Sequence, residues 1–295
     1  AETQMNKILK EGGNIFKGDE GGSETIRIKR DDVDPTLKWL EGILGIDLVN
    51  RKLGTTGKKE TSGDLDIAVD QNEVSKDDLI KKLMAWVNEN HPELDLANSD
   101  EKEMKQKIRQ WIHKTGVSVH FKTPIKTKEG GDEFNGYVQT DLMFGNPDFM
   151  LWAVKGEMGP SEYRGGDRQN LINAIATQRG YAWSAFFGLK DRESGERTND
   201  PQDVVDKVLG PGHKPEDFDS IYTLFDIIAD KEKYPDDVYE AIREKAGFEF
   251  PHRDETLDEA KKIEPRIQHA EDLIFFEGSE GAIRVLDALE KMNDP

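Results

Sequence analysis

The alternation of hydrophobic and polar positions changes character near the middle of the chain. Up to about residue 150, runs with the two-residue period of strands are interleaved with runs that have the 3.6-residue period of helices. The pattern predicts helices over 31–45, 76–90 and about 99–114, and strands near 46–53, 64–70, 117–121 and 137–144. Beyond residue 150 it predicts helices near 167–180, 201–209, 215–230, 235–246, 255–272 and 279–292.

These patterns predict an α+β protein in which a small mixed sheet with packed helices precedes a mainly helical region. We divide the chain into a flexible, glycine-rich N-terminal segment (1–25), a mixed domain (26–150) and the helical region (151–295). Residues typical of helix starts support the helix positions. Within 31–45, Asp34 is the expected N-cap and Pro35 the first helical residue, and Ser75 is expected to cap the helix over 76–90.

Two carboxylates interrupt the hydrophobic alternation of the strand at 64–70. Asp64 and Asp66 are two residues apart, so in an extended strand their side chains share one face while Leu65 and Ile67 point into a core. A further aspartate, Asp141, lies in the middle of the strand at 137–144, where burial is costly unless the carboxylate is paired or binds a metal. Oxygen ligands of this kind suit Mg²⁺, or Mn²⁺ in its place.

The turn before this strand is rich in glycine, hydroxyl and ammonium groups. Its candidate phosphate-binding residues are Gly54, Thr55, Thr56, Gly57, Lys58, Lys59, Ser62 and Gly63. Backbone N–H groups, hydroxyls and ammonium groups are the donors that a triphosphate needs. The turn and the two aspartates together predict a site for a metal ion and a nucleoside triphosphate.

Composition narrows the function classes. The 295-residue chain has no cysteine and a formal net charge of −19, which argues against indiscriminate coating of nucleic acid. It has no apolar run long enough to span a bilayer and no secretory signal, so we expect a cytoplasmic protein that has no membrane partner. The segment 101–128 reverses the charge, with eight basic and two acidic side chains. Such a segment fits a path for RNA or DNA, and equally a solvated helix face followed by a charged edge strand.

The stretch around the two aspartates, GKKETSGDLDIAVD, resembles the palm motif of the DNA polymerase beta-like nucleotidyltransferase superfamily, most closely its family X polymerases. YVQTDLMF is similar to the segment that carries the family's third carboxylate. The resemblance covers about 26–144 and is weaker over 145–240. It implies a palm fold in which Asp64 and Asp66 bind two Mg²⁺ ions and Asp141 completes the catalytic one.

The same resemblance implies that Gly54 and Thr55 stand for the Gly-Ser pair that touches the outgoing phosphates. Two departures affect that half of the site. The spacing from Gly54 to Asp64 is one residue shorter than in family X, and Thr56 and Gly57 occupy the place of the arginine pair. Few residues precede the palm-like segment, which favours a compact nucleotidyltransferase over a gap-filling DNA polymerase.

Three functions are compatible with these residues. The first is transfer of a nucleoside monophosphate from a (d)NTP to a hydroxyl, with a nucleic-acid 3′ end as acceptor and pyrophosphate as product. The second keeps the chemistry but modifies a protein or small molecule, as in AMPylation, and the acidic composition suits it. The third is a non-catalytic nucleotide-binding or structural protein, against which the three intact carboxylates argue.

Other residues are given structural roles. The six histidines lack metal-ligand spacing on a shared face, and the five tryptophans are expected in cores. As an alternative to a core role, Trp183 or Phe187 could stack on a nucleotide base. A triphosphate contact by Tyr163, Arg164, Arg168 and Arg179 is the alternative to a solvated helix start.

Overall fold

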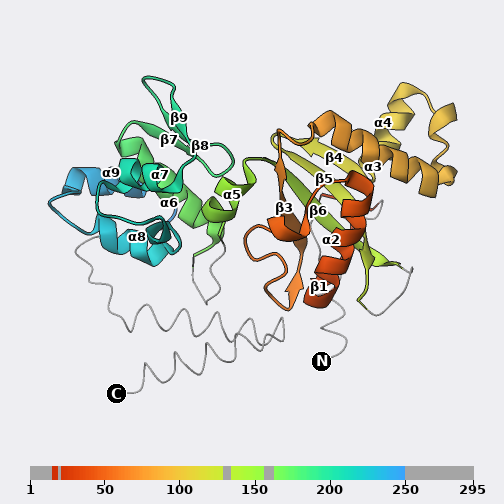
Figure 1. Ribbon diagram of the computed structural model, residues 1–295, viewed down its shortest axis with the longest axis horizontal. Helices are drawn as coiled ribbons and strands as arrows, with labels where there is room; N and C mark the ends of the chain where they lie inside the picture. Colours follow the sequence, from red (N-terminus) through yellow and green to blue (C-terminus); the bar gives the residue numbers. More distant parts are fainter. Residues whose placement is uncertain (1–14, 19–20, 129–133, 156–162, 250–295) are drawn as a thin grey trace, which may run out of the picture. The chain divides into compact units, whose positions relative to one another are not determined.

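The computed structural model describes residues 15–18, 21–128, 134–155 and 163–249, which form two compact units, 1–147 and 148–295 (Figure 1). The predicted helices at 255–272 and 279–292 lie outside the described residues. Helices and mixed sheets occur together, so the α+β class is confirmed. None of the helices described is long and apolar enough to cross a lipid bilayer.

A four-stranded mixed sheet forms the centre of the first unit. Its strands are β3 (Asp64–Asp70), β6 (Phe134–Gly145), β5 (Ser118–Lys126) and β4 (Ile112–Thr115), and they lie in that order. β3 runs parallel to β6, whereas β5 is antiparallel to both β6 and β4. Asp66 pairs with Asp141, and Asp141 pairs with His120, so these three residues form a row across three strands.

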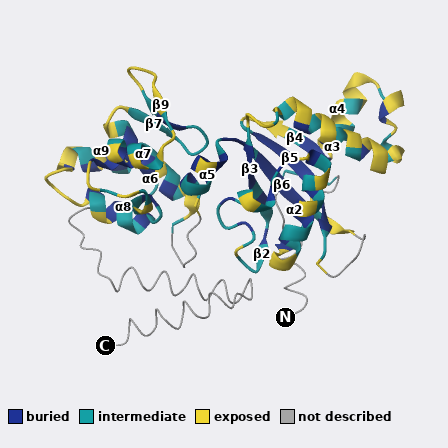
Figure 2. Ribbon diagram, in the orientation of Figure 1, coloured by how far each residue is buried: buried dark blue, intermediate teal, exposed yellow. Residues whose placement is uncertain are grey.

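One face of this sheet is covered by α2 (Arg30–Leu44) and α3 (Lys76–Asn90), as Figures 1 and 2 show. Apolar side chains of both helices pack on the inward residues of the strands, including Leu65, Ile67 and Leu142. Because side chains alternate along a strand, the aspartates between these residues point to the opposite face. The Ser75 side chain accepts a hydrogen bond from the Asp78 N–H, as expected for the N-cap of α3.

Three predicted elements of the first unit are wrong in detail. The expected strand near 46–53 is instead a short 3₁₀ helix, η1 (Val49–Arg51), because the Glu41 carboxylate binds the N–H groups of Leu48 and Val49. Helix α2 begins before Asp34 and contains Pro35. The helix expected over 99–114 ends early, as α4 (Glu101–Arg109), since the residues from Ile112 onward pair with β5 as β4.

The described part of the N-terminal segment packs against the sheet. Phe16 is buried, and its ring lies edge-on to His113 of β4 at 5.2 Å between centroids. The Ile15 N–H donates to the Gln139 side chain, and Glu24 pairs with Lys122 at 2.8 Å. After this segment, β1 (Ile28–Lys29) pairs with β2 (Thr61–Ser62), just before β3.

The second unit combines helices with a small antiparallel sheet. Its helices are α5 (Pro147–Ala153), α6 (Gly165–Gln178), α7 (Pro201–Leu209), α8 (Ile221–Ile228) and α9 (Asp236–Ala246). Its strands lie in the order β7 (Tyr181–Ser184), β8 (Gly188–Asp191), β9 (Arg197–Thr198). The helix predicted over 215–230 is divided into η4 (Pro215–Phe218) and α8, because Ser220 caps α8 through the Tyr222 N–H.

Gly188 begins β8, where it pairs with Ser184 of β7 and lies close to Thr198 of β9. Its φ of +98° disfavours other residues, and a Cβ atom there would lie 2.1 Å from the Thr198 carbonyl oxygen. Gly195 has a similar φ of +76° but nothing within 4 Å. We expect Gly188→Ala to lower the free energy of unfolding by about 1–3 kcal/mol more than Gly195→Ala, since only the first adds a steric clash. Urea unfolding of both variants measures this difference, and equal losses would contradict it.

Candidate metal centre

Three carboxylates meet on the sheet face that α2 and α3 leave uncovered. Asp64, Asp66 and Asp141 each offer an oxygen, and these three oxygens lie within 4.8 Å of one another. The parallel register of β3 and β6 places Asp66 directly beside Asp141. The three aspartates singled out in the sequence are therefore brought together, although two of them are 75 and 77 residues from the third.

Burial and the nearby carboxylates make the ionisation of Asp64 and Asp66 costly. Burial, first, and then the charges of Asp64 and Asp141 raise the pKa of Asp66 to about 8, and a hydrogen bond with Asp141 adds to the rise. Burial and the charge of Asp141 also raise the pKa of Asp64. A cation between the oxygens would relieve both effects, so the donor set fits a hard divalent metal ion.

Asp141 is held by residues that the sequence did not single out. The His120 Nδ1 and the Gln139 Nε2 lie 2.6 and 2.9 Å from Asp141 Oδ1. The other ring nitrogen of His120 lies 2.6 Å from the Thr115 hydroxyl. His120, Gln139 and Asp141 are each less than a tenth exposed. The sequence does place His120 in the other strand of the predicted hairpin. It does not give the register of that hairpin, which is needed to pair His120 with Asp141.

Hydrogen bonds join β3 to the glycine-rich turn that precedes it. Thr56 accepts a hydrogen bond from the Asp66 N–H at 3.0 Å, and the Leu53 N–H donates to the Asp66 carbonyl at 2.8 Å. The Ser62 hydroxyl accepts from the Gly57 N–H at 3.4 Å. Thr56 and Ser62 are buried, so among the predicted phosphate-binding residues these two support the turn itself.

Three positively charged residues belong to the turn or contact a residue close to it. Lys58 is exposed and Lys59 half-buried, and neither makes an ion pair or side-chain hydrogen bond with any described residue. Arg27, which sequence reasoning missed, binds the Thr61 hydroxyl at 2.9 Å. Its charge opposes the rise in the pKa of Asp64, so it lies within electrostatic reach of the carboxylates.

A comparison with models of known protein families found no match to this chain, and a search of curated proteins found no significant match. The case for a function therefore depends on the residues and their geometry.

The basic segment 101–128 is less positive in the fold than in the sequence. Lys105 pairs with Glu101 and Lys114 with Asp77, while Lys107 binds the Leu94 carbonyl and the Ser99 hydroxyl. Lys122 is buried, lies 4.0 Å from the centroid of the Trp111 ring and pairs with Glu24. These partners reduce the charge available to a polyanion.

In the second unit, a triphosphate contact by Arg168 and base stacking by Trp183 lose support, because both side chains already have partners within that unit. The buried Arg168 guanidinium donates to the carbonyls of Phe218, Ala153 and Lys155, which occupies it structurally. Trp183 donates to Gln169 at 2.7 Å and packs against the core of that unit. The Arg168 guanidinium is therefore occupied by backbone carbonyls of its own unit, and Trp183 is a half-buried residue packed against the core of that unit.

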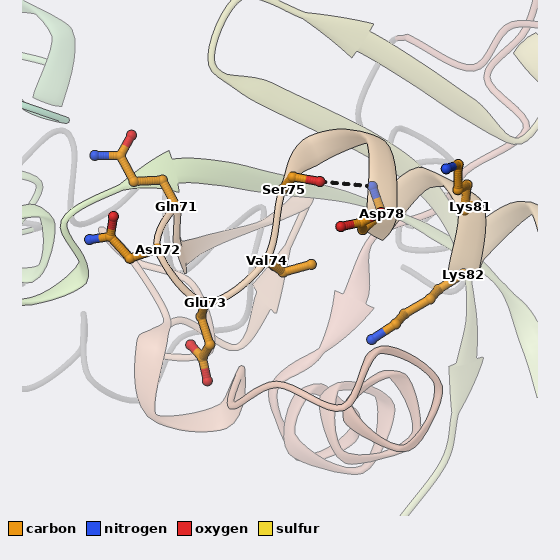
Figure 3. A pocket seen from close by; sticks show the side chains of 8 residues that line it. All are labelled: Gln71, Asn72, Glu73, Val74, Ser75, Asp78, Lys81 and Lys82. Atoms are coloured by element: carbon orange, nitrogen blue, oxygen red, sulfur yellow. Dashed lines mark hydrogen bonds between the residues drawn. The ribbon is translucent and has the colours of Figure 1, made fainter.

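A hollow of about 640 Å³ lies beyond the other end of β3 (Figure 3). Residues 71–75 and the first turns of α3 line it, including Gln71, Asp78 and Lys82. β3 places it roughly 20 Å from Asp64, because a strand rises about 3.3 Å per residue. The carboxylates do not line this hollow.

Proposed function

We propose that the protein is a Mg²⁺-dependent nucleotidyltransferase whose first unit is a palm of the polymerase beta-like type. The observation that carries the proposal is the convergence of Asp64, Asp66 and Asp141 on the sheet face opposite α2 and α3, with their oxygens within 4.8 Å. The raised pKa of Asp66 supports it, because a carboxylate cluster that resists ionisation without a cation is suited to binding one.

Asp64, Asp66 and Asp141 would hold the metal ions. When bound, Mg²⁺ makes an acceptor hydroxyl more acidic and neutralises the triphosphate. In the reaction, the acceptor oxygen forms a bond to the α-phosphorus, the bond from this phosphorus to pyrophosphate breaks, and the hydroxyl proton passes to solvent water. The protein contributes position and charge.

Cations near the glycine turn supply the second half of the proposed site. The Lys58 and Lys59 side chains have no hydrogen-bond or ion-pair partner among the described residues, and Arg27 lies close enough to Asp64 to affect its pKa. These residues provide positive charge of the kind that family X places in the arginine pair after its Gly-Ser turn. We assign them to the triphosphate, with Gly54 and Thr55 at the turn.

A nucleic-acid 3′ end is the first candidate acceptor, through the segment 101–128. The neutralised lysines of this segment favour the second candidate, a hydroxyl on a protein, since they leave less charge to attract a phosphate backbone.

An experiment with labelled nucleotides tests the function and separates the acceptors. The full chain is incubated with MgCl₂ and each α-³²P-labelled NTP or dNTP, together with an RNA oligonucleotide, a DNA oligonucleotide or a protein acceptor. Label on RNA or DNA with release of pyrophosphate supports the first acceptor, and label on protein supports the second. No label and no pyrophosphate from any combination would reject the proposed activity and favour a nucleotide-binding or structural role.

A further inference from the structure

His120 is a buried residue beside Asp141 on the sheet face that carries the three carboxylates. It lies opposite Asp141 in the β5–β6 pairing, and both side chains are less than a tenth exposed. The His120 Nδ1 lies 2.6 Å from Asp141 Oδ1, and a carboxylate that binds a metal ion only accepts hydrogen bonds, so we assign the proton of His120 to Nδ1. The Thr115 hydroxyl, 2.6 Å from Nε2, fixes the orientation of the imidazole ring.

A second donor binds the same oxygen. The Gln139 Nε2 donates to Asp141 Oδ1 at 2.9 Å, and the Gln139 Oε1 in turn accepts from the Ile15 N–H at 3.1 Å. A carboxylate oxygen has two lone pairs, so two donors saturate Oδ1 and leave Oδ2 for a further partner. Both donors are themselves held by other groups, which restricts rotation of the carboxylate.

We propose that His120 is a positioning residue, which fixes the Asp141 carboxylate with Oδ2 directed at the metal ion. This inference rests on the proposed function, because it assigns Asp141 as a metal ligand. A carboxylate without fixed donors rotates among orientations, and binding a metal must then restrict that rotation. Hydrogen bonds from neighbours to ligating groups commonly change metal affinity by 10- to 100-fold when they are removed.

Two substitutions separate positioning from a general contribution to stability. Asparagine in His120→Asn places an amide near the position of Nδ1, so it can still donate to Asp141. Glutamine in His120→Gln places its amide near the position of Nε2, so it can still reach Thr115 but not Asp141. A residue that only fills space would respond to both substitutions alike.

The experiment measures Mn²⁺ binding to the full chain by electron paramagnetic resonance, which detects free Mn²⁺, without nucleotide. We expect His120→Gln to weaken Mn²⁺ binding by about tenfold or more and His120→Asn to retain affinity within about threefold of the wild type. His113→Gln is the matched control, since His113 lies in the same row but on β4, beyond His120. Its affinity should equal that of the wild type.

Equal Mn²⁺ affinity in His120→Gln, His120→Asn and the wild type would overturn the inference, as would equal losses in both variants. Circular dichroism verifies that each variant folds. If His120→Gln does not fold, the exposed Thr115→Val replaces it, because it removes only the partner of Nε2, and unchanged affinity there would count against the proposal.

A further variant, Asp141→Asn, distinguishes failure of this inference from failure of the metal site. Loss of Mn²⁺ binding in Asp141→Asn with no effect of His120→Gln rejects only the role of His120. Unchanged Mn²⁺ binding in Asp141→Asn rejects the metal site itself, and the inference with it.

Discussion

We expect Asp66→Asn to reduce the proposed nucleotidyl transfer by about a thousandfold or more while the protein stays folded. Asparagine keeps the shape of the side chain but removes the charge that a divalent cation requires. A thousandfold loss corresponds to about 4 kcal/mol of transition-state stabilisation. We expect similar losses for Asp64→Asn and Asp141→Asn, because all three oxygens lie within 4.8 Å of one another. Pyrophosphate release under saturating NTP measures the effect.

Asp70→Asn is the control for these variants. Asp70 ends the same strand and follows Asp64 and Asp66 at even spacing, so it shares their face but lies about 13 Å beyond Asp66. Its activity should stay within about twofold of the wild type, since it lies outside the cluster. The assignment fails if Asp66→Asn keeps wild-type activity, or if Asp70→Asn loses as much as Asp66→Asn.

The elements that could be predicted from the sequence are those determined by residues within or next to the element. The bounds of β3, α3 and α7 agree with the predicted ones, because the alternation in β3 and the residues that cap the two helices, Ser75 for α3 and Asp200 for α7, are encoded within a few residues. The shared face of Asp64 and Asp66 follows from the same local period.

Contacts between distant residues account for the errors. η1 replaces a predicted strand because Glu41 binds backbone N–H groups seven and eight residues later. The lysines of 101–128 lose charge to Asp77 and Glu24, which lie outside that segment. A count of the charges within one segment does not show which residues elsewhere in the chain pair with them.

The carboxylate cluster depends on both local patterns and contacts between distant residues. The sequence indicated all three aspartates, but the neighbours of Asp141 depend on the register between β5 and β6, which shifts between Pro124 and Lys126. A shift of one residue would have turned His120 to the other face. His120 could therefore be seen as a partner of Asp141 only in the folded chain.

Without metal, the contribution of Asp66 to the stability of the protein will fall as pH rises from about 4 to 8. The pKa of Asp66 is about 8 in the folded protein, against an ordinary value of 3.8, so between these values the folded state holds a proton that the unfolded state has lost. The unfolding free energy then decreases with pH, at up to ~1.4 kcal/mol per pH unit for this one proton. The raised pKa of Asp64 acts in the same direction.

Melting temperatures measured in EDTA at pH 5, 6, 7 and 8 test this prediction when the wild type is compared with Asp66→Asn. The variant should lose less stability over this range, because its amide does not ionise, while Asp70→Asn should follow the wild type. Equal pH dependence in the wild type and Asp66→Asn would contradict the shift. Mg²⁺ competes with protons for the same oxygens, so it should raise the melting temperature of the wild type more at pH 8 than at pH 5. The carboxylates that destabilise the metal-free protein at neutral pH are then the groups through which the metal stabilises it.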